Sequence, residues 1–233
     1  MEMTPDELKE HIENILKLTA IRLKDVYDNH KEMDGCFKES MFNSRLVFPK
    51  YRDDKTRVSE QELRFTFVEV FNEYCNLKGL QLYYSVETPT NDSYSGFSKG
   101  KPKVDPDGQS ANFDLVVHEA VDKDGQIQLK RVCFIEFKAH SADLKKYKKD
   151  FLKLDNSVEN KLGTSLRYFF NVFEKMEKPT ISTLNKKIKD LDEYTSDETI
   201  YSTSKIGHTT TCFFPLDGNN FQLYFIPQKE LEG

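Results

Sequence analysis

The sequence predicts a layered α/β domain, in which helices cover a β-sheet. From Ser59 onward, the hydrophobic patterns follow the order helix, strand, strand, strand, helix and strand. The chain has 233 residues, which is enough to bury a hydrophobic core. Its aromatic fraction of 12%, with 18 Phe, 11 Tyr and no Trp, favours a packed core that contains strands.

The N-terminal segment predicts a helix ahead of this domain. Thr4 is a suitable N-cap, Pro5 takes the first helical position, and Glu7 completes a capping box. A broad apolar face then recurs at helical spacing, and the stretch after it is irregular and mixed in composition. We therefore expect residues 1–54 to form an N-terminal helical extension and residues 55–233 to form the main α/β domain.

The main domain begins with a second capping box, formed by Ser59 and Glu62. Its helix is expected to end near Gly79, and a strand over residues 80–86 follows. Residues 89–110 are rich in Gly, Pro, Ser and Asn, which is typical of a polar loop.

Two strands follow over residues 112–119 and about 126–139, joined as a hairpin by the turn at residues 122–125. The remaining patterns predict a helix, a strand, a helix and a C-terminal hairpin, over residues 141–154, 167–173, 180–191, and 209–214 with 221–227.

Composition and spacing exclude several classes of protein. The net charge is 34 − 39 = −5, which by itself disfavours a protein coated for nucleic acid. No apolar run approaches the ~20 residues of a membrane span, and the acidic start lacks the apolar stretch of a secretory signal. The four cysteines include no Cys-x-x-Cys pair, which fits neither a zinc site nor a disulfide framework. We therefore expect a cytoplasmic protein with no membrane partner.

Two charged residues interrupt the apolar run of the strand at residues 126–139. Glu136 and Lys138 are two residues apart, so both side chains project from the same face of the strand. Charges in a buried strand are costly unless they are paired or bind a metal. The alternative is a simple ion pair at a strand end, and the exposed Glu7-x-Lys9 at a helix start shows that this spacing alone is not diagnostic.

Asp114 interrupts the preceding strand in the same way. With a three-residue hairpin loop from Lys123 to Gly125, Asp114 faces Phe134, and Glu136 is its diagonal neighbour. Diagonal pairs lie ~7–8 Å apart at the backbone, so both carboxylates can reach one cation. A shift of one residue would place Asp114 on the opposite face.

A third acid comes from the helix that starts at Ser59. Glu60 shares the face of Leu63 and Phe67 and is expected to point toward the sheet, with Glu62 as its competitor. Both acids are also favoured at a helix start by the helix dipole. Oxygen ligands without His or Cys suit Mg²⁺ or Mn²⁺, which polarises a phosphoryl oxygen and lowers the pKa of bound water. With Lys138 to orient that water or stabilise negative charge, these residues predict a phosphodiester hydrolysis site.

Together, these residues resemble the PD-(D/E)XK nuclease superfamily, which has the restriction-endonuclease-like fold. The matching positions are Asp114, then Glu136-Phe137-Lys138, and upstream an acid at Glu60 or Glu62. The order of elements from Ser59 to Phe173 is similar to that family's core of helix, three strands, helix and strand, and it covers about half of the chain.

The resemblance implies a mixed central sheet and a metal site. In the family, the two acids bind Mg²⁺ or Mn²⁺ together with the backbone carbonyl after the glutamate, here that of Phe137, and the lysine assists the nucleophilic water. This sequence departs from the pattern at Phe113, where proline is common. It also lacks a Gln-x-x-x-Tyr signature after the helix, which disfavours the exonuclease branch that carries one.

Lysines gather on both sides of the predicted site. The segment from Phe137 to Lys153 holds six lysines and two aspartates, and three more lysines precede the strand of Asp114. Basic flanks suit a phosphate backbone, although a solvated face of an amphipathic helix has the same composition. The nucleic-acid-binding candidates are Lys99, Lys101, Lys103, Lys145, Lys146 and Lys149.

Three functions follow as hypotheses. The first is a metal-dependent nuclease that hydrolyses phosphodiester bonds of DNA, with RNA as the alternative substrate. The second is a catalytically inactive module of the same fold that binds nucleic acid or a protein partner. The third is an assembly subunit that forms a homodimer through its N-terminal helix.

Overall fold

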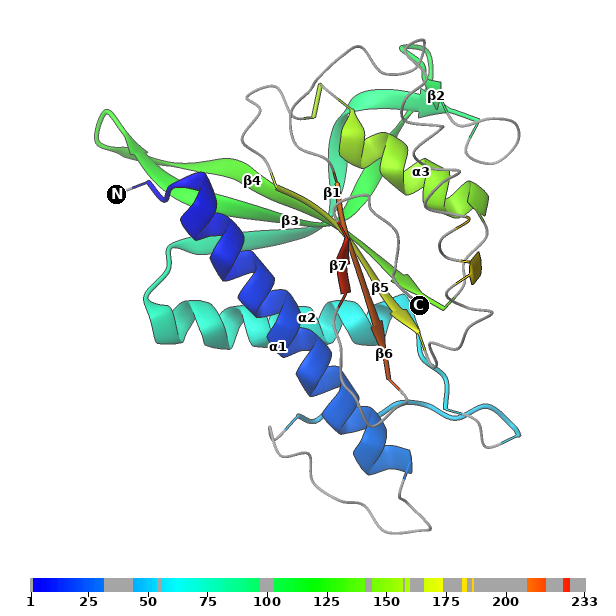
Figure 1. Cartoon of the computed structure of the whole chain (residues 1–233). Coiled ribbons are helices and arrows are strands. Elements are labelled where there is room, and N and C mark those ends of the chain that lie inside the picture. Colours follow the sequence, from blue (N-terminus) through cyan, green and yellow to red (C-terminus); the bar gives the residue numbers. More distant parts are fainter. Residues whose placement is uncertain are drawn as a thin grey trace.

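The helices and strands build a three-layered α/β structure. In the residues that the computed structural model describes, seven strands form one mixed sheet in the order β2-β1-β3-β4-β5-β6-β7. The helices α1 and α2 cover one face of the sheet, and α3 covers the other (Figure 1). The predicted α/β class with a mixed sheet is thus confirmed. The described residues are 2–31, 44–53, 56–96, 103–140, 144–156, 158–159, 166–173, 182–183, 186, 209–216 and 224–226.

The bounds of the elements agree with most of the predicted ranges. The helices are α1 (Pro5–Lys31), α2 (Glu60–Lys78) and α3 (Leu144–Asp155). The strands are β1 (Leu82–Ser95), β2 (Lys103–Val104), β3 (Gln109–Lys123), β4 (Gln126–Ala139), β5 (Leu166–Phe173), β6 (Thr210–Pro215) and β7 (Tyr224–Ile226). Most of the helix predicted over residues 180–191 lies outside the described residues.

The predicted polar loop over residues 89–110 is wrong for most of the described positions. The strand β1 continues to Ser95, and Tyr94 pairs with Gln109 of β3 and with Val104 of β2. Tyr94 is buried, so this segment contributes an apolar contact despite its polar composition. Pairing with a distant strand has overridden the local turn propensity.

The helix α1 is built into the core of the domain. Its predicted capping box is present, because Thr4 N–H donates to Glu7 Oε2 at 2.9 Å and Glu7 N–H donates to Thr4 Oγ1 at 3.3 Å. Its apolar face, which includes Ile12 and Leu16, shares one buried cluster with α2 and the sheet. The apolar face of α1 therefore supplies part of the core and packs within its own chain.

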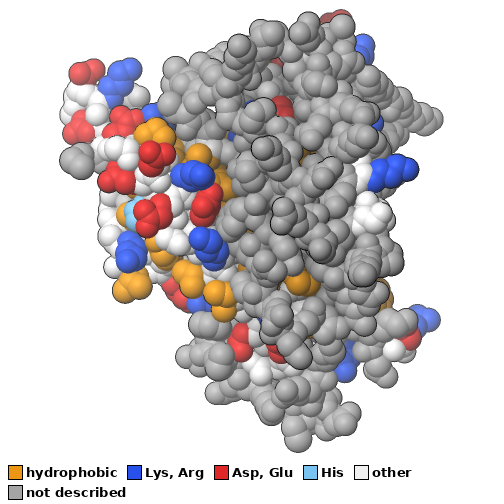
Figure 2. Space-filling model, viewed as in Figure 1, with side chains coloured by type: hydrophobic (Ala, Val, Ile, Leu, Met, Phe, Trp, Pro, Cys, Tyr) orange, Lys and Arg blue, Asp and Glu red, His pale blue; other side chains and the backbone are white. Residues whose placement is uncertain are grey.

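The outward surface of this layer carries mixed charges. Acidic and basic side chains alternate with apolar ones on the visible described surface at the left of Figure 2, which corresponds to the α1 side of Figure 1. Leu18 and Ile21 are among the exposed apolar residues. None of the described helices combines the length and apolar character needed to cross a membrane.

The first turn of α2 lies in space next to the C-terminal end of β4. Its predicted capping box is present, since Ser59 N–H donates to Glu62 Oε2 at 2.8 Å, and it ends at Gly79, whose φ of 66° is left-handed. The ring of Phe67 packs against that of Phe137 in a tilted arrangement, with centroids 5.6 Å apart, which fixes the helix over the sheet. Because His140 Nε2 also lies 3.0 Å from Val58 O, the first turn of α2 is held next to the last residues of β4.

The hairpin between β3 and β4 differs from the predicted register. Its turn has two residues, Asp124 and Gly125, with φ values of 55° and 80°, and these positive angles are typical of the type I′ turn that Asp-Gly favours. A bulge between Val117 and His118 then shifts the pairing. The expected Asp114–Phe134 pairing is therefore wrong, because Phe134 faces Val116 instead.

The bulge has a direct consequence for the site. A two-residue turn alone would have changed the pairing parity and moved Asp114 to the face opposite Glu136. The extra residue restores the parity, and the ladder continues to the pair Leu115–Ile135. The next positions along the two strands are Asp114 and Glu136, so the two acids emerge side by side where the strands separate.

Candidate active site

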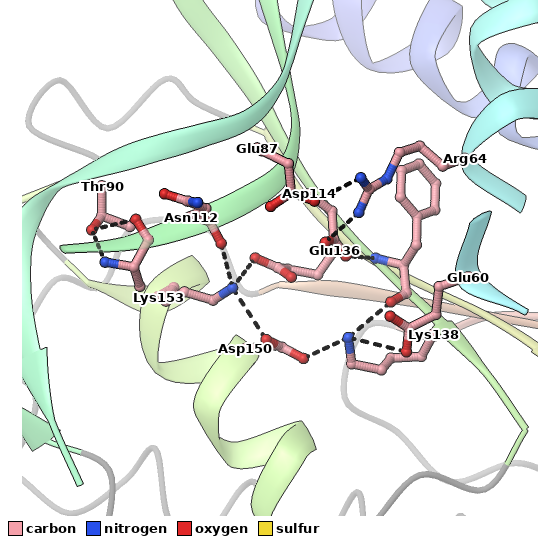
Figure 3. Close-up of polar contacts among 12 residues, drawn as sticks. Glu60, Arg64, Glu87, Thr90, Asn112, Asp114, Glu136, Lys138, Asp150 and Lys153 are labelled. Atoms are coloured by element: carbon pink, nitrogen blue, oxygen red, sulfur yellow. Dashed lines mark hydrogen bonds and ion pairs between the residues drawn. The ribbon is translucent and has the colours of Figure 1, made fainter. Parts of the chain in front are cut away.

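Asp114 is fixed at the point where β3 and β4 separate. The backbone N–H of Phe137 donates to Asp114 Oδ2 at 2.8 Å, in place of a backbone acceptor on β3. The Arg64 guanidinium donates to Asp114 Oδ1 at 2.8 Å, and its other terminal nitrogen donates to Glu87 at 2.6 Å (Figure 3). Asp114 is therefore held rigidly, and each carboxylate oxygen keeps lone pairs for another partner.

Glu136 lies beside Asp114 on the neighbouring strand and is buried, with a relative exposure of 1%. Its Oε1 atom is in close ion-pair contact with the Nζ atom of Lys153, which is also buried. Burial raises the pKa of Glu136 well above its ordinary range, with Asp150 and Asp114 acting in the same direction and Lys153 opposing them. A buried carboxylate whose pKa is strongly perturbed by burial and by neighbouring charges often marks a functional position.

Lys138 lies on the same face of β4, and it is surrounded by oxygen atoms. Its Nζ donates to the carbonyl oxygen of Phe137 at 2.9 Å, and it lies 2.9 Å from Asp150 Oδ2 and 3.5 Å from Glu60 Oε1. Burial alone would lower the pKa of Lys138, but the carboxylates of Asp150, Glu136, Asp114 and Glu60 outweigh it and raise that pKa. Lys138 is therefore a protonated ammonium that can donate but not accept.

The two candidate acids of α2 have separate roles. Glu60 pairs with Lys138, and burial raises the pKa of Glu60, with the carboxylates of Asp114 and Asp150 contributing. Glu62 instead caps its own helix through Ser59. Of these two acids, the structure thus brings Glu60 to the cluster of Asp114, Glu136 and Lys138.

The sequence reasoning missed two residues of α3. Asp150 and Lys153 were counted only as part of a basic helix, yet both are buried, and their side chains lie 3.1 Å apart. Their spacing carried a signal, because an acid and a base three residues apart border the apolar stripe of Tyr147 and Leu154. Lys153 also donates to Asn112 O at 2.8 Å, which ties α3 to β3.

Arg64 and Glu87 were also missed. Arg64 is one of the buried residues of α2, and Glu87 has a positive φ of 47° within β1. A buried arginine on the sheet-facing side of a helix requires an acidic partner, and its position one turn after Glu60 was the available signal.

Of the predicted nucleic-acid-binding lysines, the structure describes the side chains of Lys103, Lys146 and Lys149. Lys99 and Lys101 lie outside the described residues, as does the side chain of Lys145. Lys103 is exposed on β2 and lies 3.4 Å from Asp105, and Lys146 is exposed on α3. Lys149 is partly buried. Their role in nucleic-acid binding stays a prediction.

The donor atoms suit a hard divalent cation. Asp114, Glu136 and the carbonyl of Phe137 offer only oxygen atoms as ligands. Among the described residues, however, no three His, Cys, Asp or Glu side chains converge closely enough to hold a metal ion. The ammonium groups of Lys138 and Lys153 lie between the carboxylates (Figure 3). The residues thus fit Mg²⁺ or Mn²⁺ by donor chemistry, with two internal cations beside them.

Comparison with models of known protein families finds no match, and comparison with curated protein sequences finds no significant relative. The interpretation of this site therefore depends on its own geometry and chemistry.

Proposed function

We propose that this protein is a metal-dependent nuclease of the PD-(D/E)XK type that hydrolyses phosphodiester bonds of DNA. The observation that carries the proposal is the meeting of Asp114, Glu136 and Lys138 where β3 and β4 separate. Burying charged groups in this way costs free energy that apolar residues would not cost, so a chemical role explains why they are there.

The order of the elements supports the restriction-endonuclease-like fold. The helix α2 is followed by the antiparallel strands β1, β3 and β4, then by α3, and β5 pairs with β4 in parallel. The short strand β2 is an addition at the edge of the sheet beside β1. This order places the two acids and the lysine at the end of neighbouring strands, in reach of both α2 and α3.

In the proposed mechanism, Asp114, Glu136 and the carbonyl of Phe137 would hold Mg²⁺ or Mn²⁺. The bound ion supplies a Lewis acid for the phosphate and lowers the pKa of a water molecule. Lys138 keeps its proton, so it does not act as a base. It orients the attacking water by donating a hydrogen bond, or it stabilises negative charge on the phosphate, and Asp150 and Glu60 hold its ammonium in place.

The test is cleavage of plasmid DNA and of RNA with Mg²⁺ or Mn²⁺. We expect Asp114→Ala and Lys138→Met to lower the cleavage rate roughly 100-fold or more, the cost of removing a transition-state contact. Lys9→Met is the matched control, because Glu7-x-Lys9 has the same spacing but lies on the exposed side of α1. A purified wild-type protein that cleaves neither substrate with either metal would overturn the proposal.

One observation favours the inactive module as the second candidate. Lys138 and Lys153 already neutralise the buried carboxylates, so the cluster needs no metal for charge balance. This module would bind DNA without cutting it. A wild-type protein without cleavage that still shifts DNA, with an affinity that falls steeply as salt rises, would support this alternative.

The proposal includes a reducing, cytoplasmic setting. Cys75, Cys133 and Cys212 are free thiols, and all three are buried. Burial raises the pKa of Cys75 to about 11, which keeps that thiol protonated and unreactive near neutral pH.

A further inference from the structure

The Lys153 ammonium lies in a position that resembles a cation site. It contacts Glu136 Oε1, lies 3.1 Å from Asp150 Oδ1, and donates to Asn112 O at 2.8 Å (Figure 3). These oxygens come from three different elements, β4, α3 and β3. Two carboxylates and a carbonyl around one buried positive charge are the donor set that a divalent cation also prefers.

The second internal cation, Lys138, differs from Lys153 in what it contacts. Lys138 Nζ is held by Asp150 Oδ2, Glu60 and the carbonyl of Phe137. Of the two lysines, Lys153 is the one in ion-pair contact with Glu136 Oε1. A metal bound through Glu136 would therefore share this carboxylate with Lys153, so the two cations would compete for it.

We propose that Lys153 is an internal counter-cation that lowers the affinity of this site for the divalent metal. This inference rests on the proposed function, because it concerns the same site. A metal at Glu136 would bring a second cation to the carboxylate that the Lys153 ammonium already contacts, and the repulsion between the two would weaken metal binding. The ring of Phe113, whose centroid is 5.8 Å from Lys153 Nζ, offers the ammonium a neighbouring favourable surface.

The charges of the cluster support this competition. Three basic groups, those of Arg64, Lys138 and Lys153, contact the acids of the cluster, and Lys153 is the one that contacts both Glu136 and Asp150. Removing Lys153 makes the cluster more negative by one charge at a short distance from the metal position. In a poorly solvated site, this change strongly favours the binding of a cation.

The experiment measures Mn²⁺ binding by calorimetry and by electron paramagnetic resonance, without DNA. Lys153→Met keeps most of the side-chain volume and removes the charge, so we expect Mn²⁺ to bind at least ~10-fold more tightly than in the wild type. Lys9→Met, on the exposed side of α1, is expected to bind Mn²⁺ as the wild type does. Glu136→Gln in the Lys153→Met background should abolish the gain.

The results separate this inference from the proposed nuclease function. Tighter Mn²⁺ binding by Lys153→Met supports the counter-cation even if the wild type cleaves nothing, in which case only the nuclease proposal fails. Equal or weaker binding overturns the counter-cation, while loss of cleavage in Asp114→Ala still supports the nuclease. Lys153→Gln, which removes the charge but keeps a hydrogen-bond donor, is the second variant if Lys153→Met is unfolded. If neither variant folds with or without Mn²⁺, Lys153 is structural and the inference is wrong.

Discussion

The two faces of the sheet are packed by different means. On the face of α1 and α2, the core is apolar, and rings such as those of Phe67, Phe137 and Phe170 pack at centroid distances of 5.6 and 6.2 Å. On the face of α3, an aromatic cluster around Phe134 and Phe169 gives way to buried charges at the ends of the strands. An apolar core of similar volume would stabilise the fold at least as well as these charges. The first face therefore provides stability, and the second carries a chemical site at some cost in stability.

The largest loss of stability should follow from removing an acid of the charged cluster while its basic partners remain. Asp150→Ala leaves the ammonium groups of Lys138 and Lys153 without their shared partner, so we expect a loss of about 3–5 kcal/mol in the free energy of unfolding. Glu10→Ala, an exposed position on α1, is the control and should change little. Urea denaturation measures both. A small effect of Asp150→Ala would mean that water already screens the cluster.

Truncating a side chain of the apolar face should lower the stability of the protein but leave its metal affinity unchanged. Leu16→Ala removes a fully buried side chain of α1, and we expect it to lower the free energy of unfolding by about 2–5 kcal/mol. Under conditions where this variant is folded, its Mn²⁺ affinity should equal that of the wild type. A changed metal affinity would show that the two faces are coupled, which contradicts the division of roles between them.

Much of this division could be predicted from local patterns. Both capping boxes, the bounds of β4 and the inward face of Glu60 follow from signals a few residues apart, which the chain satisfies wherever it folds. The placement of Asp114 with Glu136 and Lys138 also followed from alternation along two strands. It was obtained with a wrong turn length, however, and it holds only because the bulge after Val117 compensates.

The remainder depended on distant contacts. A bulge reflects the packing of a whole sheet, so no local signal announced the one beside His118. The strand character of residues 89–95 comes from pairing with β3, which overrides a turn-rich composition. Asp150 and Lys153 lie in a helix whose composition suggests solvent exposure, and only the approach of α3 to β4 shows that they are buried.

Removing the N-caps of α1 and α2 tests the same division of roles, with a smaller expected loss of stability. Ser59→Ala and Thr4→Ala each remove an N-cap, and each should cost about 1 kcal/mol in the free energy of unfolding. Only Ser59→Ala should also lower DNA cleavage, because α2 presents Glu60 to Lys138 in its first turn. Equal effects of the two variants on cleavage would show that the start of α2 does not position the site.

The subtlest test compares the pH dependence of one acid from each face. On the α1–α2 side, the hydrogen bond from Arg22 lowers the pKa of Glu73, which lies on the exposed rim. On the α3 side, burial raises the pKa of Glu136. A carboxylate whose pKa is lowered by folding stabilises the protein at pH values above its pKa in the unfolded chain, about 4.3. This stability is lost as the pH falls through its pKa in the folded protein. A carboxyl group whose pKa is raised by folding stabilises the protein at pH values below about 4.3. This stability is lost as the pH rises through its pKa in the folded protein.

The Glu73→Gln and Glu136→Gln variants should therefore show opposite changes in stability with pH, relative to the wild type. The difference in free energy of unfolding between the wild type and Glu73→Gln should grow as the pH rises from about 3.5 to 7, because the paired carboxylate becomes charged. The same difference for Glu136→Gln should shrink over that range, because the wild type must then bury a charge that the variant lacks. Urea denaturation at several pH values measures both differences. A slope of the same sign for the two variants would mean that the attraction of Lys153 outweighs the burial of Glu136, and that the two faces treat a carboxylate alike.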